Sequence, residues 1–367
     1  MKRITTLAIS VALTLALAAA FSACKTAEDG AEETPEFSML PVITITPTPE
    51  PTPPPYTGKY NPLSGLPIAE ELVNARPLAI MLNNRKIAQP QLGISQADII
   101  FEVPAEGGIT RMLAIFQDVS AAGPIGSVRS SRPYYIDLAE GFDSIYICAG
   151  GSPDAYTTLK NRKITYLDGV NGSRQEVYYR DKERRKTMGY EHSLVTSGEL
   201  LNKYIPTYDF RTEHEAAFRN PLQFEADYDL RGGQDAGAVK LDFSGKTTAF
   251  AYNAETADYR MTQYNNEYKD GNNGQRVTFA NVVVLKTAIS AIKGDTEGRL
   301  TVKTTGDGDG FLAIGGKYVP IKWSKASNDA PLVFTDAAGN AVTLRSGHTY
   351  IGVMSTTAKV EFSEAEK

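Results

Sequence analysis

Short apolar runs predict β-strands between residues 57 and 225. Three of them, at 77–82, 97–103 and 110–116, are followed by asparagine, proline or other polar residues, as expected for buried strands. In the third run both alternating faces carry apolar residues, so we expect it to be covered on both sides. A further run at 144–149 predicts another strand. This segment therefore has the pattern of an N-terminal α/β-like domain with a mixed sheet.

Two helices are predicted directly after polar turns in this segment. Pro133 suits the first turn of a helix and Gly141 its end, which predicts a helix over about 133–140. Ser152 has the chemistry of an N-cap for a helix running to about residue 160, after a tight turn at Gly150 and Gly151. Both helix N-termini would then lie on one edge of the sheet, where open α/β sheets generally bind ligands.

The pattern changes to short alternating runs from about residue 236 to 362. Turns of the Gly-Asn or Asp-Gly type separate them, which predicts a β-rich C-terminal domain, either an antiparallel sandwich or a barrel. The fold class is therefore α+β. A Gly-Asp repeat at 306–310 lacks the further acidic ligands of a calcium loop, so we interpret it as a flexible hairpin tip. The ten predicted strands are 239–243, 248–252, 259–264, 277–285, 300–304, 311–314, 318–323, 332–335, 341–344 and 349–354.

The N-terminal pattern is that of an exported protein. A basic start, an apolar run from Leu7 to Phe21 and small residues before Cys24 predict a signal peptide over 1–23. Cys24 stands where bacterial lipoproteins carry the acylated cysteine, although ordinary secretion with a chance cysteine is the alternative. Segment 24–56 is rich in proline and threonine and predicts an extended tether. We expect membrane attachment through the lipid.

Composition excludes several classes of function. The chain has 367 residues, 42% of them hydrophobic and 22% charged, which is enough for two folded domains. A formal charge of -5 argues against a nucleic-acid-binding protein, which needs a basic face. Three histidines and two cysteines leave little room for a metal centre or a disulfide scaffold. We expect no metal and no cofactor.

Charged residues gather where the predicted strands end. Glu102, Glu106, Arg111, Arg129 and Arg132 fall within thirty-one positions. An arginine at the end of a covered strand needs a carboxylate or a ligand, and the two glutamates are the nearest candidates in sequence. The other two arginines precede the predicted helix at 133–140. Guanidinium groups and the amides of a helix N-terminus favour the same oxyanion, so this group predicts an anion-binding site.

Five more residues are candidates for the same site. Gly150, Gly151 and Ser152 could line a pocket with backbone amides, or the glycines could simply make a tight turn. Arg180 follows two tyrosines and could point inward, although charge runs are usually solvated. His192 lies in a loop before a capping box at 196–199. A loop histidine can act as a general base or an anion donor, but a lone one more often satisfies local hydrogen bonds.

Several blocks of sequence occur in a specific order along the chain. The N-terminal blocks are Asn61-Pro62-Leu63-Ser64-Gly65-Leu66-Pro67, Arg76-Pro77-Leu78-Ala79-Ile80-Met81-Leu82-Asn83-Asn84, Glu106-Gly107-Gly108-Ile109-Thr110-Arg111, Val128-Arg129-Ser130-Ser131-Arg132-Pro133 and Ala149-Gly150-Gly151-Ser152-Pro153. The C-terminal half contributes residues 281–284, the Trp323 segment and residues 347–351. In this order, the blocks resemble the YerB-like bacterial lipoproteins, a family of unknown function. The resemblance implies an α+β N-terminal domain, a β-rich C-terminal domain and a Gram-positive-type envelope location, and it brings no reaction, cofactor or catalytic residue.

Three hypotheses of function remain open at this point. The first is a non-enzymatic envelope protein that binds an anionic or wall-derived ligand, such as a wall glycan or a peptide stem, through an arginine-rich pocket. The second is a cell-wall-modifying hydrolase or transferase that uses Glu102 and Glu106, or His192. Paired carboxylates serve glycoside chemistry only when they face each other across a cleft. In the third, the charges only neutralise one another in a structural network.

Overall fold

The computed structural model describes residues 56–364. The predicted signal peptide, Cys24 and residues 25–55 of the predicted tether lie outside the described residues. Within the described part of the chain, no helix is long and apolar enough to cross a membrane.

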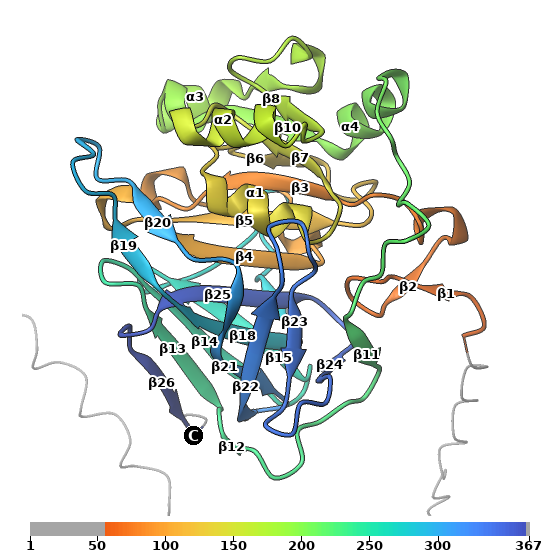
Figure 1. Ribbon diagram of the computed structural model, residues 1–367, viewed down its shortest axis with the longest axis vertical. Helices are drawn as coiled ribbons and strands as arrows, with labels where there is room; N and C mark the ends of the chain where they lie inside the picture. Colours follow the sequence, from red (N-terminus) through yellow and green to blue (C-terminus); the bar gives the residue numbers. More distant parts are fainter. Residues whose placement is uncertain (1–55, 365–367) are drawn as a thin grey trace, which may run out of the picture. The chain divides into compact units, whose positions relative to one another are not determined.

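One large mixed sheet runs through the molecule (Figure 1). Its strand order is β12-β22-β21-β18-β25-β4-β5-β3-β7-β8, with β23 beside β22. Five strands come from the N-terminal segment: β3 (Leu78–Asn83), β4 (Ile99–Pro104), β5 (Thr110–Phe116), β7 (Ile145–Cys148) and β8 (Tyr166–Asp168). Six come from the C-terminal segment: β12 (Gln234–Asp235), β18 (Asn281–Thr287), β21 (Gly306–Ile314), β22 (Lys317–Lys325), β23 (Val333–Thr335) and β25 (Thr349–Ser355).

The two segments join at β25. This strand pairs in parallel with β4 on one side and with β18 on the other, so backbone hydrogen bonds cross from one segment to the other. The expected boundary near residues 226–235 is therefore not a break in the sheet. The β-rich character predicted for the C-terminal segment is confirmed, but β25 is parallel to both neighbours and not part of a purely antiparallel array.

A second, antiparallel sheet has the order β16-β15-β14-β13-β26, with β17 beside β15. Its apolar face packs on the large sheet, because Phe250 and Met261 share one buried cluster with Ile100 and Met112. The strands are β13 (Ala238–Asp242), β14 (Thr247–Asn253), β15 (Asp258–Gln263), β16 (Asn266–Glu267), β17 (Thr278–Phe279) and β26 (Val360–Ser363).

Smaller elements cover the rest of the large sheet. The short strands are β1 (Lys59–Tyr60) with β2 (Pro67–Ile68), β6 (Pro124–Gly126) and β9 (Tyr179–Arg180) on either side of β10 (Leu194–Ser197), β11 (Gln223–Glu225) with β24 (Thr343–Arg345), and β19 (Ile289–Ala291) with β20 (Leu300–Val302). Short 3-10 helices are η1 (Glu70–Leu72), η2 (Lys86–Ala88), η3 (Ile94–Gln96), η4 (Glu106–Gly108), η5 (Gln175–Val177), η6 (Tyr190–His192) and η7 (Ile205–Thr207).

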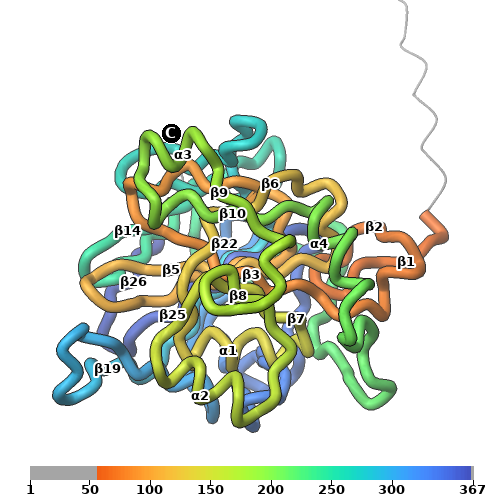
Figure 2. Tube along the Cα trace, turned by 90° about the horizontal axis from the view of Figure 1, so that it is seen from above, coloured from red at the N-terminus to blue at the C-terminus, as the bar shows by residue number. Residues whose placement is uncertain are grey.

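The two predicted helices are confirmed as α1 (Pro133–Glu140) and α2 (Pro153–Asn161). The capping box at 196–199 begins α4 (Gly198–Tyr204), and α3 (Lys182–Thr187) is added. The Ser152 hydroxyl accepts a hydrogen bond from the Ala155 amide at 3.2 Å, as expected for an N-cap. Figure 2 shows α1 and α2 on one side of β3 and β8, and the β6-β10-β9 sheet on the other. The N-terminal strands are therefore covered on both faces, as the pattern of 110–116 predicts.

Alternation along β4 explains how the two faces differ. Phe101 and Val103 belong to the apolar cluster on the α1 side, whereas Ile100 belongs to the cluster under the second sheet. Successive side chains of a strand point to opposite faces, so Glu102 points with Ile100 into the core between the two sheets. Its side chain has no exposed surface. A carboxylate in this position needs partners, because an unpaired buried charge costs several kcal/mol.

Six polar groups surround the Glu102 carboxylate. Its Oε1 atom accepts from Lys246 Nζ at 2.8 Å, Thr110 Oγ1 at 2.6 Å and Asn84 Nδ2 at 3.1 Å. Its Oε2 atom accepts from Thr248 Oγ1 at 2.9 Å, Gln263 Nε2 at 3.1 Å and Tyr350 OH at 2.8 Å. Four of these partners belong to the C-terminal segment. A single carboxylate of the N-terminal segment therefore holds β14, β15, β25 and the turn before β14.

One expectation is wrong. The Gly-Asp repeat at 306–310 is not a hairpin tip but the first half of β21, paired with β22. Gly308 is required because a Cβ there would lie 2.5 Å from the Trp323 indole nitrogen, and one at Gly310 would lie 2.4 Å from the Val284 carbonyl oxygen.

Replacement of Lys246 tests the buried ion pair. We expect Lys246→Ala to lower the free energy of unfolding by about 3–5 kcal/mol, because it leaves Glu102 buried without a counter-charge. Urea unfolding monitored by circular dichroism measures the difference. Lys322→Ala is the matched control, since Lys322 pairs with Asp309 on the surface and its loss should leave the free energy of unfolding almost unchanged. Equal effects of the two substitutions would contradict this reading.

Candidate functional site

The structure separates Glu102 from the arginines. Glu102 lies between the two sheets, whereas Arg111 follows Thr110 in β5 and points to the opposite face, toward α1. The two glutamates proposed as a catalytic pair therefore do not face each other across a cleft. Glu102 is a core residue, and the sequence reasoning assigned it to the site only because it is close to Arg111 along the chain.

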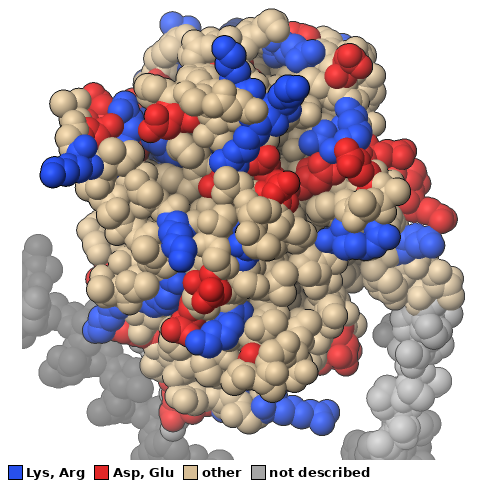
Figure 3. Space-filling view, in the orientation of Figure 1, with Lys and Arg blue, Asp and Glu red and all other residues tan. Residues whose placement is uncertain are grey.

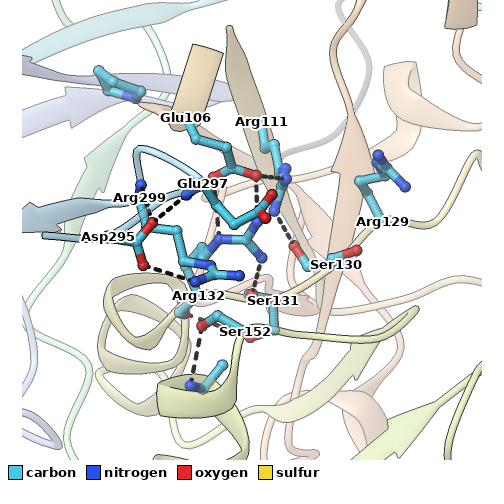
Figure 4. Close-up of polar contacts among 12 residues, drawn as sticks. Glu106, Arg111, Arg129, Ser130, Ser131, Arg132, Ser152, Asp295, Glu297 and Arg299 are labelled. Atoms are coloured by element: carbon cyan, nitrogen blue, oxygen red, sulfur yellow. Dashed lines mark hydrogen bonds and ion pairs between the residues drawn. The ribbon is translucent and has the colours of Figure 1, made fainter. Parts of the chain in front are cut away.

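Glu106 holds two of the predicted arginines. Its Oε1 atom accepts from the Nη2 atoms of both Arg111 and Arg132, and its Oε2 atom accepts from Arg132 Nε at 3.1 Å (Figure 4). Despite its partial burial, the two guanidinium groups keep the pKa of Glu106 below its usual value. Arg111 and Arg132 also donate to the carbonyl oxygens of Ser130 and Ser131, at 2.7 and 2.6 Å. In this largely buried cluster, Glu106 balances one of the two guanidinium charges.

Arg129 is not part of this cluster. Figure 4 shows its guanidinium apart from Glu106. Its only carboxylate partner among the described residues is Glu191 of η6, whose side chain is 52% exposed. The Arg129 Nε atom is buried and finds no acceptor within the described part of the chain. Burial lowers the pKa of Arg129, and the positive charges of Arg111 and Arg85 lower it further, while Glu191 acts in the opposite direction.

His192 lies beside Arg129 and is oriented by Asn83. The Asn83 side-chain oxygen accepts from the Arg85 amide at 3.0 Å, so its Nδ2 group donates to His192 Nδ1 at 2.8 Å. This bond places the imidazole proton on Nε2, which makes Nε2 a donor. Burial lowers the pKa of His192. The charges of Arg129 and Arg85 lower it further, whereas Glu191 opposes them. The imidazole is therefore neutral at pH 7.

The backbone amides of the turn at residues 150–152 are engaged by neighbouring residues. The Gly150 amide donates to Asp168 Oδ1 at 2.7 Å, and the Ser152 amide donates to the Ser131 carbonyl oxygen at 3.3 Å. Gly150 has a φ of 80°, which favours glycine at this position. The expected pocket of free amides is therefore not found at Gly150 or Ser152, and Ser152 acts as a helix cap. Gly151 pairs with Ser131 through an isolated bridge.

Arg180 packs on an aromatic ring. Its guanidinium lies 3.7 Å from the centre of the Tyr190 ring and donates to the Tyr190 carbonyl oxygen at 2.6 Å. Tyr190 is 60% exposed and directly precedes Glu191. Arg180 thus supports the η6 turn that carries Glu191 and His192, and it makes no ion pair within residues 56–364.

Arg85 is the residue that sequence reasoning missed. It follows β3 and Asn83, it is exposed, and it forms no ion pair among the described residues. A hollow of about 420 Å³ lies beside it, lined by Arg85, Lys86, Ile87, Ile109 and Tyr264. A signal was present, because Asn83 ends β3, and the neighbouring strand β5 carries Arg111. We call Arg85, Arg129 and His192 the arginine surface.

Charge on the molecule is otherwise mixed. Figure 3 shows positive and negative side chains interspersed over the face that it draws, without a continuous basic area. Arg111 and Arg132 share the Glu106 carboxylate, Arg129 pairs with Glu191, and Arg85 has no carboxylate partner in the described part of the chain. This local positive excess can attract one anionic group. No cluster of three or more metal-binding side chains occurs in the described part of the chain.

The lowered pKa of His192 predicts a pH effect on stability. Below about pH 6.5, the ordinary histidine pKa, the unfolded chain binds a proton that the native imidazole does not yet bind. Stability should therefore decrease as pH falls through this value. Thermal unfolding of the wild type and of His192→Gln between about pH 7.5 and 5.5 measures the contribution. The wild type should lose stability relative to the variant on acidification, and a constant difference would contradict the neutral state.

Comparison with known proteins gives the chain its family. Residues 63–211 match the N-terminal domain, and residues 239–351 the C-terminal domain, of a family described as protein of unknown function DUF3048. The chain is 28% identical over 270 residues to a Bacillus subtilis (strain 168) protein named Putative lipoprotein YerB, covering 72% of this chain and 78% of that protein. A crystal structure of YerB from Bacillus subtilis superposes with a TM-score of 0.71 at 26% identity, covering 83% of this chain and 99% of that one. The chain belongs to this family of YerB-like proteins with DUF3048 N- and C-terminal domains.

Proposed function

We propose that the protein is a lipid-anchored protein on the extracytoplasmic face of the cell membrane, where the arginine surface binds an anionic or wall-derived ligand. The location is supported by the lipobox pattern at Cys24, by the proline-rich segment that follows it and by the word lipoprotein in the name of the Bacillus relative. The ligand is proposed to carry a carboxylate or phosphate group.

The observation that carries the proposal is the pairing of Arg129 with Glu191. The Arg129 side chain is mostly buried, and its Nε–H group has no acceptor in the described residues. Its carboxylate partner, Glu191, is exposed. An exposed carboxylate on a short turn contributes little stability, so a ligand anion can replace it at small cost. Arg85 and the Nε2–H group of His192 then supply further donors for the same anion.

The size of the neighbouring hollow favours a ligand larger than an inorganic ion. Ile87 is 52% exposed and, with Ile109 and Tyr264, gives this hollow an apolar wall next to Arg85. A peptide stem or a glycan with an acidic group could place its anion on the arginines and its apolar surface in the hollow. Such a combination of a few charged groups and an apolar wall is common in binding sites.

Hydrolase chemistry receives less support from the same residues. Glu102 has no exposed surface, so it cannot reach a substrate. Two arginines hold Glu106 in its ionised form, which cannot donate a proton as a general acid. His192 Nδ1 is occupied by Asn83, so the imidazole presents a donor and not a base toward the arginine surface. These groups favour binding of an anion over proton abstraction.

Arg129→Ala tests the binding proposal directly. Loss of a charge-assisted hydrogen bond costs about 1.5–3 kcal/mol, so we expect retention on purified cell walls to weaken by roughly ten- to a hundredfold. Sedimentation of the protein with wall fragments, with and without their anionic polymers, measures the retention. Glu191→Gln should strengthen it, because the internal competitor for Arg129 loses its charge.

Arg219→Ala is the matched control, since Arg219 is exposed and bonds only to nearby carbonyl oxygens. Its retention should equal that of the wild type. The Arg129 variant should keep its melting temperature, whereas Arg132→Ala should lower it, because Arg132 balances the partly buried Glu106. Unchanged retention of Arg129→Ala would overturn the proposal, as would equal losses in both the Arg129 and Arg219 variants.

A further inference from the structure

The buried cluster at Glu102 contains an amine and an amide on one carboxylate oxygen. Lys246 Nζ donates to Glu102 Oε1 at 2.8 Å and to Thr110 Oγ1 at 3.1 Å. Asn84 Nδ2 donates to the same two atoms, at 3.1 and 2.9 Å. Two nitrogen atoms that share two oxygen neighbours at these distances are themselves neighbours. The side chains of all three residues are almost fully buried.

The Asn84 carbonyl group has an unusual environment. Its Oδ1 atom is buried and finds no donor among the described residues. Gln263, the other amide on Glu102, differs in both respects: its Nε2 atom uses the second carboxylate oxygen, and its Oε1 atom accepts from Gln89 Nε2 at 2.7 Å. A buried polar atom without a partner is costly and calls for a reason. Asn84 is therefore the amide that lies beside the amine with its carbonyl group unoccupied.

Burial makes the amine easier to deprotonate. Burial lowers the pKa of Lys246 to about 8, although the Glu102 carboxylate opposes this shift. In such a setting, one proton of the ammonium group can pass to the carboxylate, which produces an uncharged nucleophile and a carboxylic acid. The ring of Tyr264, whose centre is 5.2 Å from Nζ, covers the amine. The site places a nucleophile, an acid–base group and a side-chain amide around the same two oxygen atoms.

We propose that Lys246 and Asn84 form an intramolecular amide bond, with Glu102 as the catalytic acid and base. Nζ attacks Cγ of Asn84, the new N–C bond forms and the Cγ–Nδ2 bond breaks. One of the three protons on Nζ stays on the new amide, a second passes to Nδ2, which leaves as ammonia, and the third stays on Glu102. Glu102 ends as a neutral carboxylic acid, so no unpaired charge stays buried, and atoms and charge balance without any oxidant or co-reactant. The close placement of the three groups supplies the effective concentration.

The bond would join the two segments covalently. Asn84 directly follows β3, and Lys246 directly precedes β14, so the cross-link ties the large sheet to the second sheet. It lies beneath the hollow that borders Arg85, because Tyr264 lines that hollow and also covers Lys246. Such a link would stabilise the fold against unfolding. The described residues contain no disulfide that could do the same. The inference is independent of the arginine surface.

A digest of the purified full-length protein tests the bond. After denaturation, trypsin should release residues 60–85 joined to residues 241–260, with a mass lower than their sum by one ammonia. Arg76 precedes a proline and resists cleavage, and an acylated Lys246 is not cut. Fragmentation of the joined peptide should place the link on Asn84 and Lys246.

Two variants serve as controls. Glu102→Gln keeps most hydrogen bonds but cannot carry protons, and Lys246→Arg keeps the charge but lacks the nucleophile, so both should give the two peptides separately. The wild-type digest decides the question even if a variant fails to fold. Complete recovery of unlinked residues 60–85, together with cleavage after Lys246, would overturn the proposal.

Discussion

The fold depends on one carboxylate placed where it has no access to water. Glu102 sits on the middle of β4, next to the only strand of the C-terminal segment that pairs with the N-terminal sheet in the described residues. Its charge can be tolerated only if Lys246, Thr248, Gln263 and Tyr350 reach it, and these residues lie on or beside β14, β15 and β25. The second sheet therefore has to dock in one position. A shift by one residue along β4 would bury the charge without partners.

The same pleat separates the core from the proposed binding surface. Thr110 and Arg111 are adjacent in β5 and point to opposite faces. Thr110 therefore donates a hydrogen bond to Glu102, whereas Arg111 donates one to Glu106. On one side Lys246 balances Glu102, and on the other side Glu106 balances one of the two guanidinium charges of Arg111 and Arg132. Arg129 differs, because its partner is carried by an exposed turn. A local excess of positive charge remains where β3 ends, on a protein whose formal charge is -5.

Local sequence signals predicted much of this fold. Proline and serine mark the starts of α1 and α2, and alternation located most C-terminal strands, since both signals depend on neighbouring residues alone. The strands β12, β16, β19 and β26 were not predicted. The arrangement of the sheets could not be predicted in this way. Glu102 and Arg111 look like partners along the chain, but strand pairing places them on opposite faces. Arg85 and Lys246 were missed because their roles arise only when distant segments meet. The Gly-Asp repeat was misread, since the close approach of Trp323 is invisible in sequence.

Hydrogen exchange in increasing denaturant tests most directly whether Glu102 unites the two segments. The amides of β3 and those of β14 belong to different family domains but to the two sheets that the buried cluster connects. If the account is correct, the slowest amides of both strands exchange with the same free energy of opening and the same dependence on denaturant, as one cooperative unit. Exchange of β14 at a clearly lower free energy, while β3 stays protected, would contradict it.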